Sequence, residues 1–526
     1  MPKKSETKFS SYFKLPNPNL RSYFGRVVQG QPDEYRTPFF KGKSVEEILA
    51  GWQSHLDVLK EEWPTLLDFE NDLAKKVGPM SIMKPLELRM VDIDSYYDSI
   101  LKESEPIPDS AVDAVIQEFG RARGLRIRTQ ERTVDEMKKS TNSGAPFFRK
   151  RREVLSDSYP AKITESQMSL PSGTWDNVAV LGWRGQEGGP SPDDVKQRVV
   201  WMFPFAVNIE ELRVYQVLIE TAQKFNLVPA WVSMEAVDQS ITRLFDTKGK
   251  DDLIVCTDFS KFDQHFNEDM SDCAKTILQR LFTDNVDSQD WFENVFPVKY
   301  NISLAYDWNK IRSGKHGMGS GSGGTNADET LTHRALQYEA AQAAGSVLNP
   351  NSMCLGDDGI LSYPGINVED VTRIYSSHGQ DMNLDKQYAS TDDCTYLRRW
   401  HHKDYRQDGI CVGVYSTARA LGRLAEQERY YDPETWGPKM VALRQLSILE
   451  NVKYHPLREE FVDFCMKGDK FRLGIDIPGF LSNIEGVAKE ATDHMPDFLG
   501  YTKSMQKGAE TGISQWWIVN YLKSKA

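Results

Sequence analysis

Residues 354–363, CLGDDGILSY, set two adjacent carboxylates between short apolar runs. Apolar residues on both sides of a Gly-Asp pair predict a strand, a tight turn and a second strand. Asp357 and Asp358 can then be ordinary turn residues, or they can hold a metal ion at the tip of the hairpin. This segment alone excludes neither interpretation, so the rest of the chain has to decide between them.

A second segment, DLIVCTDFSKFDQHFNEDMSDCAKTILQRLF, predicts a buried strand followed by a helix. Residues Leu253–Cys256 form the β-branched apolar run typical of such a strand. Asn267 can cap the helix, and apolar residues recur along it at helical spacing: Met270, Cys273, Ala274, Ile277, Leu278 and Leu281. Asp258 is therefore expected at the exit of the strand, and Asp263 in the link to the helix.

A Gly-rich stretch, GMGSGSGGTNAD at residues 317–328, leads into a third unit. The residues TNADETLTHRALQYEAAQAAG predict a helix with acids in its first turn, and Gly345 is expected to end it. The centre of the chain thus indicates alternating strands and helices, whereas the last hundred residues look mostly helical.

Carboxylates on separate strands can build a site for phosphoryl transfer to a sugar hydroxyl. That reaction uses two divalent ions about 3.5–4 Å apart, one at the nucleophile and one at the leaving group. Mg²⁺ takes hard oxygen ligands, usually one or two protein carboxylates together with substrate phosphates. Asp258 can join Asp357 and Asp358 in such a site if their strands are neighbours.

Length and composition indicate a globular protein with several subdomains, because 526 residues exceed one compact core. No apolar run approaches the ~18–20 residues of a membrane span, and the N-terminus MPKKSETKFSSYFK lacks the apolar region of a secretory signal. The six cysteines form no CxxC pair, which argues against a disulfide framework or a zinc knuckle. We expect an intracellular protein without a membrane segment.

The charge distribution permits a nucleic-acid partner although the net charge is −12. Between Arg121 and Arg152 there are eleven Lys or Arg residues against three acids, a local net of +8. Such a stretch can line an electropositive channel in an otherwise acidic protein. The alternative is a solvated surface loop.

The order of these features resembles the viral RNA-dependent RNA polymerases over residues 140–402. A basic region precedes strand-Asp-x4-Asp-helix, and SGSGGT, GDD, DKQ and YLRRWHH then follow in that order. The resemblance implies an α+β fold: a closed right hand of fingers, palm and thumb, with an antiparallel palm sheet backed by helices. The implied domains are an N-terminal bridging region 1–75, fingers with part of the palm 76–250, palm 251–274, a fingers insertion 275–314, palm 315–402, and thumb with tail 403–526.

The resemblance implies template-directed RNA synthesis with release of pyrophosphate, for replication and transcription of a viral, double-stranded RNA genome. It makes Asp258, Asp357 and Asp358 the catalytic metal ligands, with the carbonyl of Phe259 as a helper. Lys386 falls where the family places a general acid for pyrophosphate, although it can also be an exposed helix charge. The implied cofactor is Mg²⁺, with Mn²⁺ as an alternative.

Nucleotide-binding residues also follow from the resemblance. Lys196 and Arg198 would meet the triphosphate, and arginine suits this because its fork holds phosphate bidentately. Asp263 would read the ribose 2′-hydroxyl, or it could simply cap the following helix. Three residues match the family's Gly-rich motif: Ser320, Gly321 and Thr325. Many relatives carry Asn where this chain has Glu329, so the residue assisting Asp263 stays open among Asn326, Asp328 and Glu329.

RNA contacts are implied at two further motifs. STNSGAP resembles the motif that guides the template, which assigns Ser143, Gly144 and Pro146; the nearby Arg149 and Arg151 can line the channel or form a fingertip surface. YLRRWHH resembles the primer-gripping hairpin, which assigns Arg398 and Arg399. The implied partners are template and product RNA, ribonucleoside triphosphates and a viral capsid protein, in the virion interior and the host cytoplasm. The oligomeric state stays open.

Two rival functions remain at this point. A reverse transcriptase shares the palm carboxylates, but usually blocks the 2′-hydroxyl with a bulky side chain where this chain has Asp263. A non-catalytic RNA-binding or capsid-associated protein would bind RNA without synthesis, and the three intact carboxylates argue against it. The aromatic tail SQWWIVNYLKSKA can pack on the thumb or gate product exit.

Overall fold

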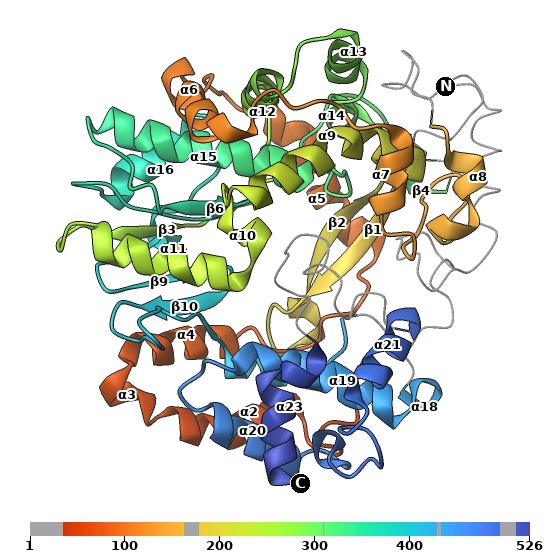
Figure 1. Cartoon of the computed structure of the whole chain (residues 1–526), viewed down its shortest axis with the longest axis vertical. Coiled ribbons are helices and arrows are strands. Elements are labelled where there is room, and N and C mark those ends of the chain that lie inside the picture. The colour runs from red at the N-terminus through yellow and green to blue at the C-terminus, as the bar shows by residue number, and fades with distance from the viewer. Residues whose placement is uncertain (1–34, 162–177, 309, 429–432, 495–511) are drawn as a thin grey trace. The chain divides into compact units, whose positions relative to one another are not determined.

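The computed structural model describes residues 35–161, 178–308, 310–428, 433–494 and 512–526 (Figure 1). Residues 1–34, on which the expected absence of a secretory signal rests, lie outside this part of the chain. The chain divides into two compact units: the first contains Lys84–Trp183 and Val199–Cys394, and the second contains Gln31–Met83, Arg184–Arg198 and Thr395–Ala526. Among the described residues, no helix is both long enough and apolar enough to span a bilayer.

An antiparallel sheet of four strands, in the order β6-β7-β3-β8, organises the first unit (Figure 1). Its strands are β3 Ile254–Thr257, β6 Met353–Leu355, β7 Asp358–Leu361 and β8 Tyr388–Ser390. Thr257 lies opposite Gly359, and Leu355 lies opposite Asp358. The predicted hairpin around Asp357 and the predicted buried strand before Asp258 are therefore confirmed.

The two helices expected from the sequence lie where predicted: α15 (Thr325–Ala343) packs against the sheet strand β6, and α12 (Glu268–Leu281) packs against α15. In α12, the side chain of Asn267 accepts a hydrogen bond from the backbone N of Met270 at 3.1 Å, and all six predicted apolar residues are buried. Helix α15 ends just before Gly345, which has a left-handed φ of +64°. Figure 1 shows α15 and α16 (Val368–Ser376) running along one side of the sheet.

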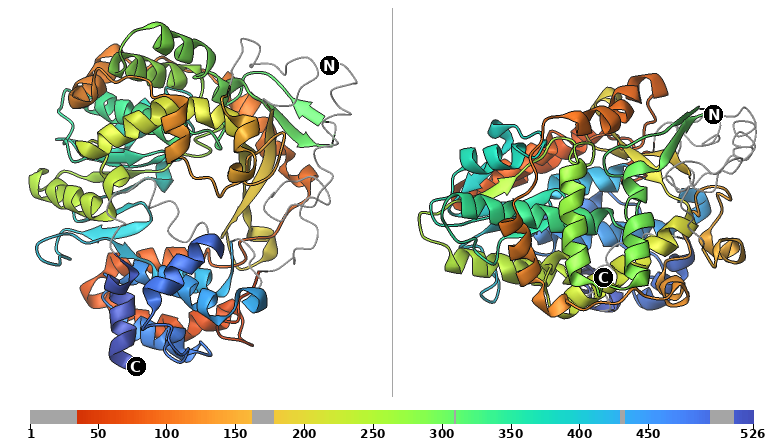
Figure 2. Two further views of the ribbon diagram at one scale, coloured as in Figure 1. Left: turned by 45° about the vertical axis from the view of Figure 1, so that its right-hand side comes forward. Right: turned by 90° about the horizontal axis from the view of Figure 1, so that it is seen from above.

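A second, mixed sheet has the order β2-β1-β4-β5. Its strands are β1 Val178–Gln186, β2 Lys196–Met202, β4 Ser303–Asp307 and β5 Lys310–Arg312. Strand β1 runs parallel to β4, and β4 and β5 form an antiparallel ribbon, green in Figure 2. The remaining helices of the first unit are α5 Leu86–Asp98, α6 Asp109–Glu118, α7 Gln130–Glu136, α8 Leu155–Ser158, α9 Phe205–Lys224, α10 Pro229–Val232, α11 Met234–Thr247, α13 Val286–Asn294 and α14 Val298–Asn301.

The second unit is mostly helical, as predicted for the end of the chain. Its helices are α2 Val45–Leu56, α3 Leu59–Glu62, α4 Pro64–Ala74, α17 Thr417–Ala425, α18 Pro433–Trp436, α19 Pro438–Leu449, α20 Arg458–Lys467, α21 Ile484–His494 and α23 Trp517–Lys525. A small sheet has the order β11-β10-β9, from β9 Asp393–Tyr396, β10 Arg399–His402 and β11 Val414–Tyr415. One apolar core contains buried residues of α2, α17, α19, α20 and α23.

The aromatic tail packs into this core. Ile518, Val519 and Leu522 of α23 are fully buried there. Glu450 accepts hydrogen bonds from the backbone N of Trp517 at 3.1 Å and of Ile518 at 2.9 Å. The side chain of Glu450 therefore caps α23, and the structure supports the packing alternative for the tail.

Glu70 of α4 is buried at the start of α17 in the same unit. It accepts hydrogen bonds from the backbone N of Thr417 at 2.7 Å and of Ala418 at 3.4 Å, and from the hydroxyl of Thr417. Burial raises the pKa of Glu70 to about 7, although these hydrogen bonds oppose the rise. The protonated and ionised forms can thus both be populated near neutral pH.

This raised pKa predicts a pH dependence of thermal stability. The folded pKa exceeds the ordinary value of 4.5, so the protonated form stabilises the fold at low pH. That contribution is lost as pH rises from about 4.5 to about 7, and amounts to the order of 3 kcal/mol. The melting temperature of the native chain, relative to that of Glu70→Gln at the same pH, should fall across this window and then level off. A difference that stays constant with pH would contradict the assignment.

Candidate active site

The register of the first sheet places Asp258 beside Asp358. Because Thr257 is opposite Gly359 in an antiparallel pair, the next residues along are Asp258 and Asp358 at the ends of neighbouring strands. Opposite Cβ atoms of such a pair lie about 4.5–5.5 Å apart. Gly356, with φ +57°, takes the first position of the two-residue turn between β6 and β7, where a positive φ favours glycine. The hairpin thus presents Asp357 and Asp358 at the edge where β3 ends.

The donor set at this edge suits a hard divalent cation. Asp258 and Asp357 are exposed and Asp358 is half-buried, whereas Phe259 is buried. Within the described residues, no group of three or more His, Cys, Asp or Glu side chains already forms a metal site. Mg²⁺ needs only one or two carboxylates when substrate phosphates supply the remaining oxygens. Carboxylates from two adjacent strand ends therefore fit Mg²⁺ together with a nucleotide.

Two of the three candidates for assisting Asp263 are engaged elsewhere. Asn326 accepts a hydrogen bond from the indole Nε1 of Trp231 at 2.8 Å. Asp328 lies 3.0 Å from the ammonium of Lys299, and both side chains are fully buried. Asn326 and Asp328 thus each have a partner other than Asp263.

Glu329 is the residue that meets Asp263. Its buried side chain is hydrogen-bonded to the Asp263 carboxyl, with Asp357 close by. Burial, and then the negative charges of Asp263 and Asp357, raises the pKa of Glu329 well above its ordinary value. In its protonated form Glu329 would donate a hydrogen bond to Asp263, as the amide of an asparagine would.

The buried carboxylate of Asp328 anchors the start of α15. The hydroxyls of Tyr215 and Tyr300 donate to it at 2.8 and 2.7 Å, in addition to the ion pair with Lys299. Burial lowers the pKa of Lys299, while Asp328 and then Glu211 oppose this effect. A buried charge is tolerated when it is paired and hydrogen-bonded in this way.

Glu211 of α9 holds the Gly-rich loop ahead of α15. It accepts hydrogen bonds from the hydroxyl of Ser322 and from the backbone N of Gly323, the latter at 3.2 Å. Sequence reasoning missed both Glu211 and Lys299, because neither lies in one of the recognised motifs and the sequence does not show which charged residues are buried.

The predicted residues of the Gly-rich loop are fixed by local contacts. The Ser320 hydroxyl donates to the carbonyl of Val199 at 3.2 Å, and the Thr325 hydroxyl donates to the carbonyl of Gly319 at 3.1 Å. A Cβ at Gly321 would lie 1.6 Å from the backbone oxygen of Trp201. Close approach of this loop to β2 therefore requires glycine at position 321.

Lys386 ends the 3₁₀ turn η6 (Leu384–Lys386) and is exposed. Its neighbour Gln387, which the sequence did not single out, contacts the carboxylate-bearing segment directly. The Gln387 side chain accepts from the backbone N of Asp258 at 2.7 Å and donates to the backbone O of Asp258 at 2.8 Å. The segment around Lys386 is thus attached to Asp258 through Gln387.

The motif at 140–146 forms a tight internal loop. Ser143 is buried, and its hydroxyl accepts from the backbone N of Arg149 at 3.2 Å. Gly144 has φ +65°, and a Cβ there would lie 2.4 Å from the backbone oxygen of Phe203. Pro146 follows a cis peptide bond and is half-buried. Ser143 and Gly144 therefore shape the loop from inside.

The two predicted basic residues beside this loop differ in their surroundings. Arg149 is exposed. Arg151 donates to the carbonyl of Lys138 at 3.2 Å and to Asn208 at 3.0 Å, and it lies over the ring of Phe205. Burial lowers the pKa of Arg151 to about 10. Charge alone did not distinguish an exposed arginine from one used inside the fold.

The remaining predicted residues belong to the second unit. Lys196 and Arg198 lie on the exposed face of β2, and Arg198 donates to Gln186 at 3.1 Å. Arg398 lies in the turn between β9 and β10 with φ +58°, 3.8 Å from the carboxylate of Glu187. Arg399 begins β10 and donates to the carbonyl of Gly413 at 3.2 Å. The expected hairpin of the YLRRWHH segment is present.

Comparison with known proteins identifies the class. The sequence profile described as viral RNA-dependent RNA polymerase matches residues 128–411, more than half of the chain. The chain therefore belongs to the viral RNA-dependent RNA polymerases. The family assignment also decides against a reverse transcriptase and against a non-catalytic RNA-binding protein.

Individual relatives show which members of this family the chain is similar to. The chain is 62% identical over 527 residues to the "Potential RNA-dependent RNA polymerase" of Human picobirnavirus (strain Human/Thailand/Hy005102/-), covering 98% of each protein. A crystal structure of a human picobirnavirus RNA-dependent RNA polymerase superposes with a TM-score of 0.91 at 59% identity, covering 100% of both chains. An insertion-loop deletion mutant gives a TM-score of 0.90 at 58% identity over 100% of both chains. These matches confirm the predicted α+β polymerase fold.

Proposed function

We propose that this RNA-dependent RNA polymerase joins ribonucleotides by two-metal nucleotidyl transfer at the edge where β3 and the β6–β7 hairpin meet. The single observation that carries the proposal is the register that sets Asp258 beside Asp358. Carboxylates from two separate chain segments converge there. The reaction proposed for them is inferred from the family to which the chain belongs.

The carboxylates of Asp258, Asp357 and Asp358, with the carbonyl of Phe259, would hold Mg²⁺, or Mn²⁺ in its place. When bound, the ions lower the pKa of the attacking 3′-hydroxyl and neutralise charge on the departing pyrophosphate. Lys386 would give a proton to the pyrophosphate from the exposed turn η6. Charges that are fixed in advance where charge develops would stabilise the transition state.

Nucleotide selection would use the residues around the start of α15. Asp263, held by Glu329, would accept a hydrogen bond from the ribose 2′-hydroxyl. Ser320, Gly321 and Thr325 would set the shape of the loop against the nascent base pair, and Asn326 would contribute through its contact with Trp231. Lys196 and Arg198 would bind the triphosphate.

RNA would contact the exposed Arg149 and the loop edge at Pro146, while Ser143, Gly144 and Arg151 maintain the loop from within. Arg398 and Arg399 would hold the primer strand. We assign the domains as fingers at 76–250 and 275–314, palm at 251–274 and 315–402, thumb with tail at 403–526, and a bridging region at 1–75. This assignment follows the positions of the motifs along the chain.

The biological setting follows the same reasoning. We propose replication and transcription of a double-stranded viral RNA genome, with capsid protein as a partner, in the virion interior and the host cytoplasm. The supporting observation is the 62% identity to the picobirnavirus protein.

A synthesis assay on single-stranded and double-stranded RNA tests the proposal. We expect the native chain to make complementary RNA with Mg²⁺ or Mn²⁺ and to make none with EDTA, and we expect Asp358→Ala to lose most of this synthesis. Absence of metal-dependent product from the native chain on both templates would refute the proposed reaction.

The pairing of Asp263 with Glu329 predicts a specific change in sugar selection. Glu329→Leu removes the donor, so the ratio of kcat/KM for UTP to that for 2′-deoxy-UTP should fall roughly 10- to 100-fold, the value of a hydrogen bond to a charged group. Glu329→Gln keeps a donor at the same reach and should retain the ratio to within about threefold.

The two variants Glu329→Leu and Glu329→Gln together separate the effect of hydrogen bonding from the effect of packing. If Glu329→Gln loses selectivity as strongly as Glu329→Leu, the neutral-donor role of Glu329 is wrong. Unchanged selectivity in both variants would remove Glu329 from ribose recognition altogether.

A further inference from the structure

Helix α15 holds the backbone of the β6–β7 turn at both polar groups of Gly356. The hydroxyl oxygen of Thr330 accepts from the backbone N of Gly356 at 2.9 Å. Nδ1 of His333 lies 2.8 Å from the backbone O of Gly356, and since a carbonyl only accepts, this nitrogen carries the proton. Gly356 directly precedes Asp357, so these two side chains fix the peptide planes from which the catalytic doublet begins.

The ring of His333 also contacts the residue after the doublet. A Cβ at Gly359 would lie 2.6 Å from Cε1 and 2.7 Å from Nε2 of His333. The ring is fully buried, and within the described structure its Nε2 has no hydrogen-bond partner. His333 therefore contacts the residues on both sides of the Asp357–Asp358 pair in the chain, Gly356 before it and Gly359 after it.

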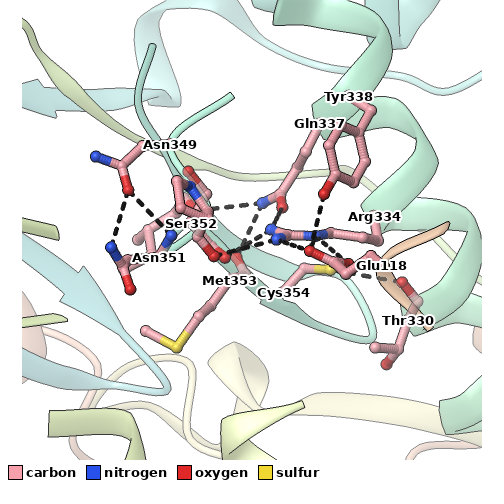
Figure 3. Close-up of polar contacts among 12 residues, drawn as sticks. Glu118, Thr330, Arg334, Gln337, Tyr338, Asn349, Asn351, Ser352, Met353 and Cys354 are labelled. Atoms are coloured by element: carbon pink, nitrogen blue, oxygen red, sulfur yellow. Dashed lines mark hydrogen bonds and ion pairs between the residues drawn. The ribbon is translucent and has the colours of Figure 1, made fainter. Parts of the chain in front are cut away.

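The same face of α15 continues this attachment along the hairpin. Thr330, Arg334 and Gln337 recur at helical spacing, and the side chains of Arg334 and Gln337 point toward the backbone of Ser352 and Met353 (Figure 3). Arg334 donates to the carbonyl of Ser352 at 2.6 Å, and Gln337 donates to the carbonyls of Met353 and Ile360 at 2.9 and 3.2 Å. These polar side chains of α15 fix the position of the hairpin along the helix.

An equivalent contact holds the other carboxylate-bearing segment. Gln387 engages both the backbone N and the backbone O of Asp258, and it also donates to the carbonyl of Asn383 at 2.9 Å. Each of the two segments that meet at the site thus has its backbone held on both sides by side chains from elsewhere. Neither hydrogen-bond set uses the carboxylate oxygens.

We propose that Thr330, His333 and Gln387 are positioning residues that fix the spacing between Asp258 and the Asp357–Asp358 doublet, and with it the affinity of the site for a divalent ion. The inference rests on the proposed function, because that function makes these carboxylates the metal ligands. Partners of this kind, one contact removed from a metal, typically change metal affinity or activity by about 10- to 100-fold when removed. Nucleotide affinity should be spared, since neither Thr330 nor Gln387 belongs to the nucleotide-binding set.

The test uses Thr330→Val and Gln387→Met, which keep size and remove the hydrogen bonds. Mn²⁺ binding without nucleotide, followed by electron paramagnetic resonance, should weaken about tenfold in each variant. In single-nucleotide extension, kcat should fall about 10- to 100-fold, while KM for the nucleotide changes less than about threefold. Thr330→Ser restores the hydroxyl and should recover both quantities.

Thr332→Val is the matched control. Thr332 is buried on the same helix, but its hydroxyl donates to the carbonyl of Met270 at 3.1 Å, away from the hairpin. Mn²⁺ affinity and kcat should therefore stay at native values in this variant. The inference is overturned if Thr330→Val and Gln387→Met both bind Mn²⁺ and extend RNA like the native chain, or if Thr332→Val loses as much. A native chain that binds Mn²⁺ yet makes no RNA would refute the proposed function, and the Mn²⁺ measurements would still decide this inference.

Discussion

Asp258→Asn is expected to lower nucleotide addition about 100- to 1,000-fold, the scale on which loss of a central electrostatic contributor reduces kcat. The substitution keeps the size of the side chain and its ability to accept a hydrogen bond. It removes only the negative charge that faces Asp358 across the ends of β3 and β7. Because Mg²⁺ binds carboxylate far more strongly than amide oxygen, the site should lose metal rather than shape.

The control for this prediction lies beyond the opposite end of the same strand. Asp251→Asn makes the identical change just before the other end of β3, at an exposed residue, and should leave kcat within about twofold of the native value, as expected for surface substitutions. Pre-steady-state extension of an RNA primer measures both variants. Asp258→Asn with more than about a tenth of native kcat would contradict the role of Asp258 as a metal ligand.

Lys299→Met is expected to cause the largest loss of stability, about 3–5 kcal/mol, because it leaves the buried carboxylate of Asp328 without its cation. Both side chains are fully buried, and their N···O distance is 3.0 Å. Adding Asp328→Asn removes the stranded charge, keeps one acceptor oxygen for a tyrosine hydroxyl and offers an amide donor to the other, since Tyr215 and Tyr300 bond different carboxylate oxygens. The double variant should therefore regain at least about half of the loss.

Denaturant unfolding followed by tryptophan fluorescence measures these differences. Lys315→Met serves as the surface control: its ion pair with Glu268 is exposed and spans 3.6 Å, so its removal should cost less than about 1 kcal/mol. A Lys299→Met chain within about 1 kcal/mol of the native one would show that the buried pair is not needed for stability.

The positions of Asp258, Asp357 and Asp358 could be predicted from the sequence because they depend on local patterns. The apolar run before Asp258 and the apolar residues flanking Asp357 and Asp358 each define a strand within a few residues. Antiparallel pairing of two such strands then brings their ends together, which the register of β3 and β7 bears out. The capping of α12 by Asn267 was equally local.

The partner of Asp263 could not be chosen from sequence, because Asn326, Asp328 and Glu329 all lie in the first turns of one helix. Their roles depend on residues far along the chain: Trp231 engages Asn326, and Lys299 engages Asp328. The side chain of Glu329 is hydrogen-bonded to Asp263. A sequence shows which residues share one face of a helix, but it does not show which distant residues contact that face.

Burial of charged residues was the other property that sequence did not reveal. Arg151 and the exposed Arg149 belong to the same basic cluster, yet Arg151 bonds to Asn208 within the fold. Gln387 follows Lys386, the residue that the family resemblance assigned, and nothing in the sequence indicated a role for Gln387. It nevertheless contacts Asp258 through two hydrogen bonds. Counts of charge or polarity do not determine which side chains turn inward.

Asp258 and the Asp357–Asp358 turn are proposed to bind the same metal ions. Fe²⁺ substituted for Mg²⁺, with ascorbate and peroxide, generates hydroxyl radicals that cut the backbone next to the bound ion. We expect two cuts, one around residues 257–259 and one around residues 356–358, both suppressed by excess Mg²⁺ and both lost in Asp258→Asn. Cleavage at only one of these segments, or at neither, would contradict a shared metal site.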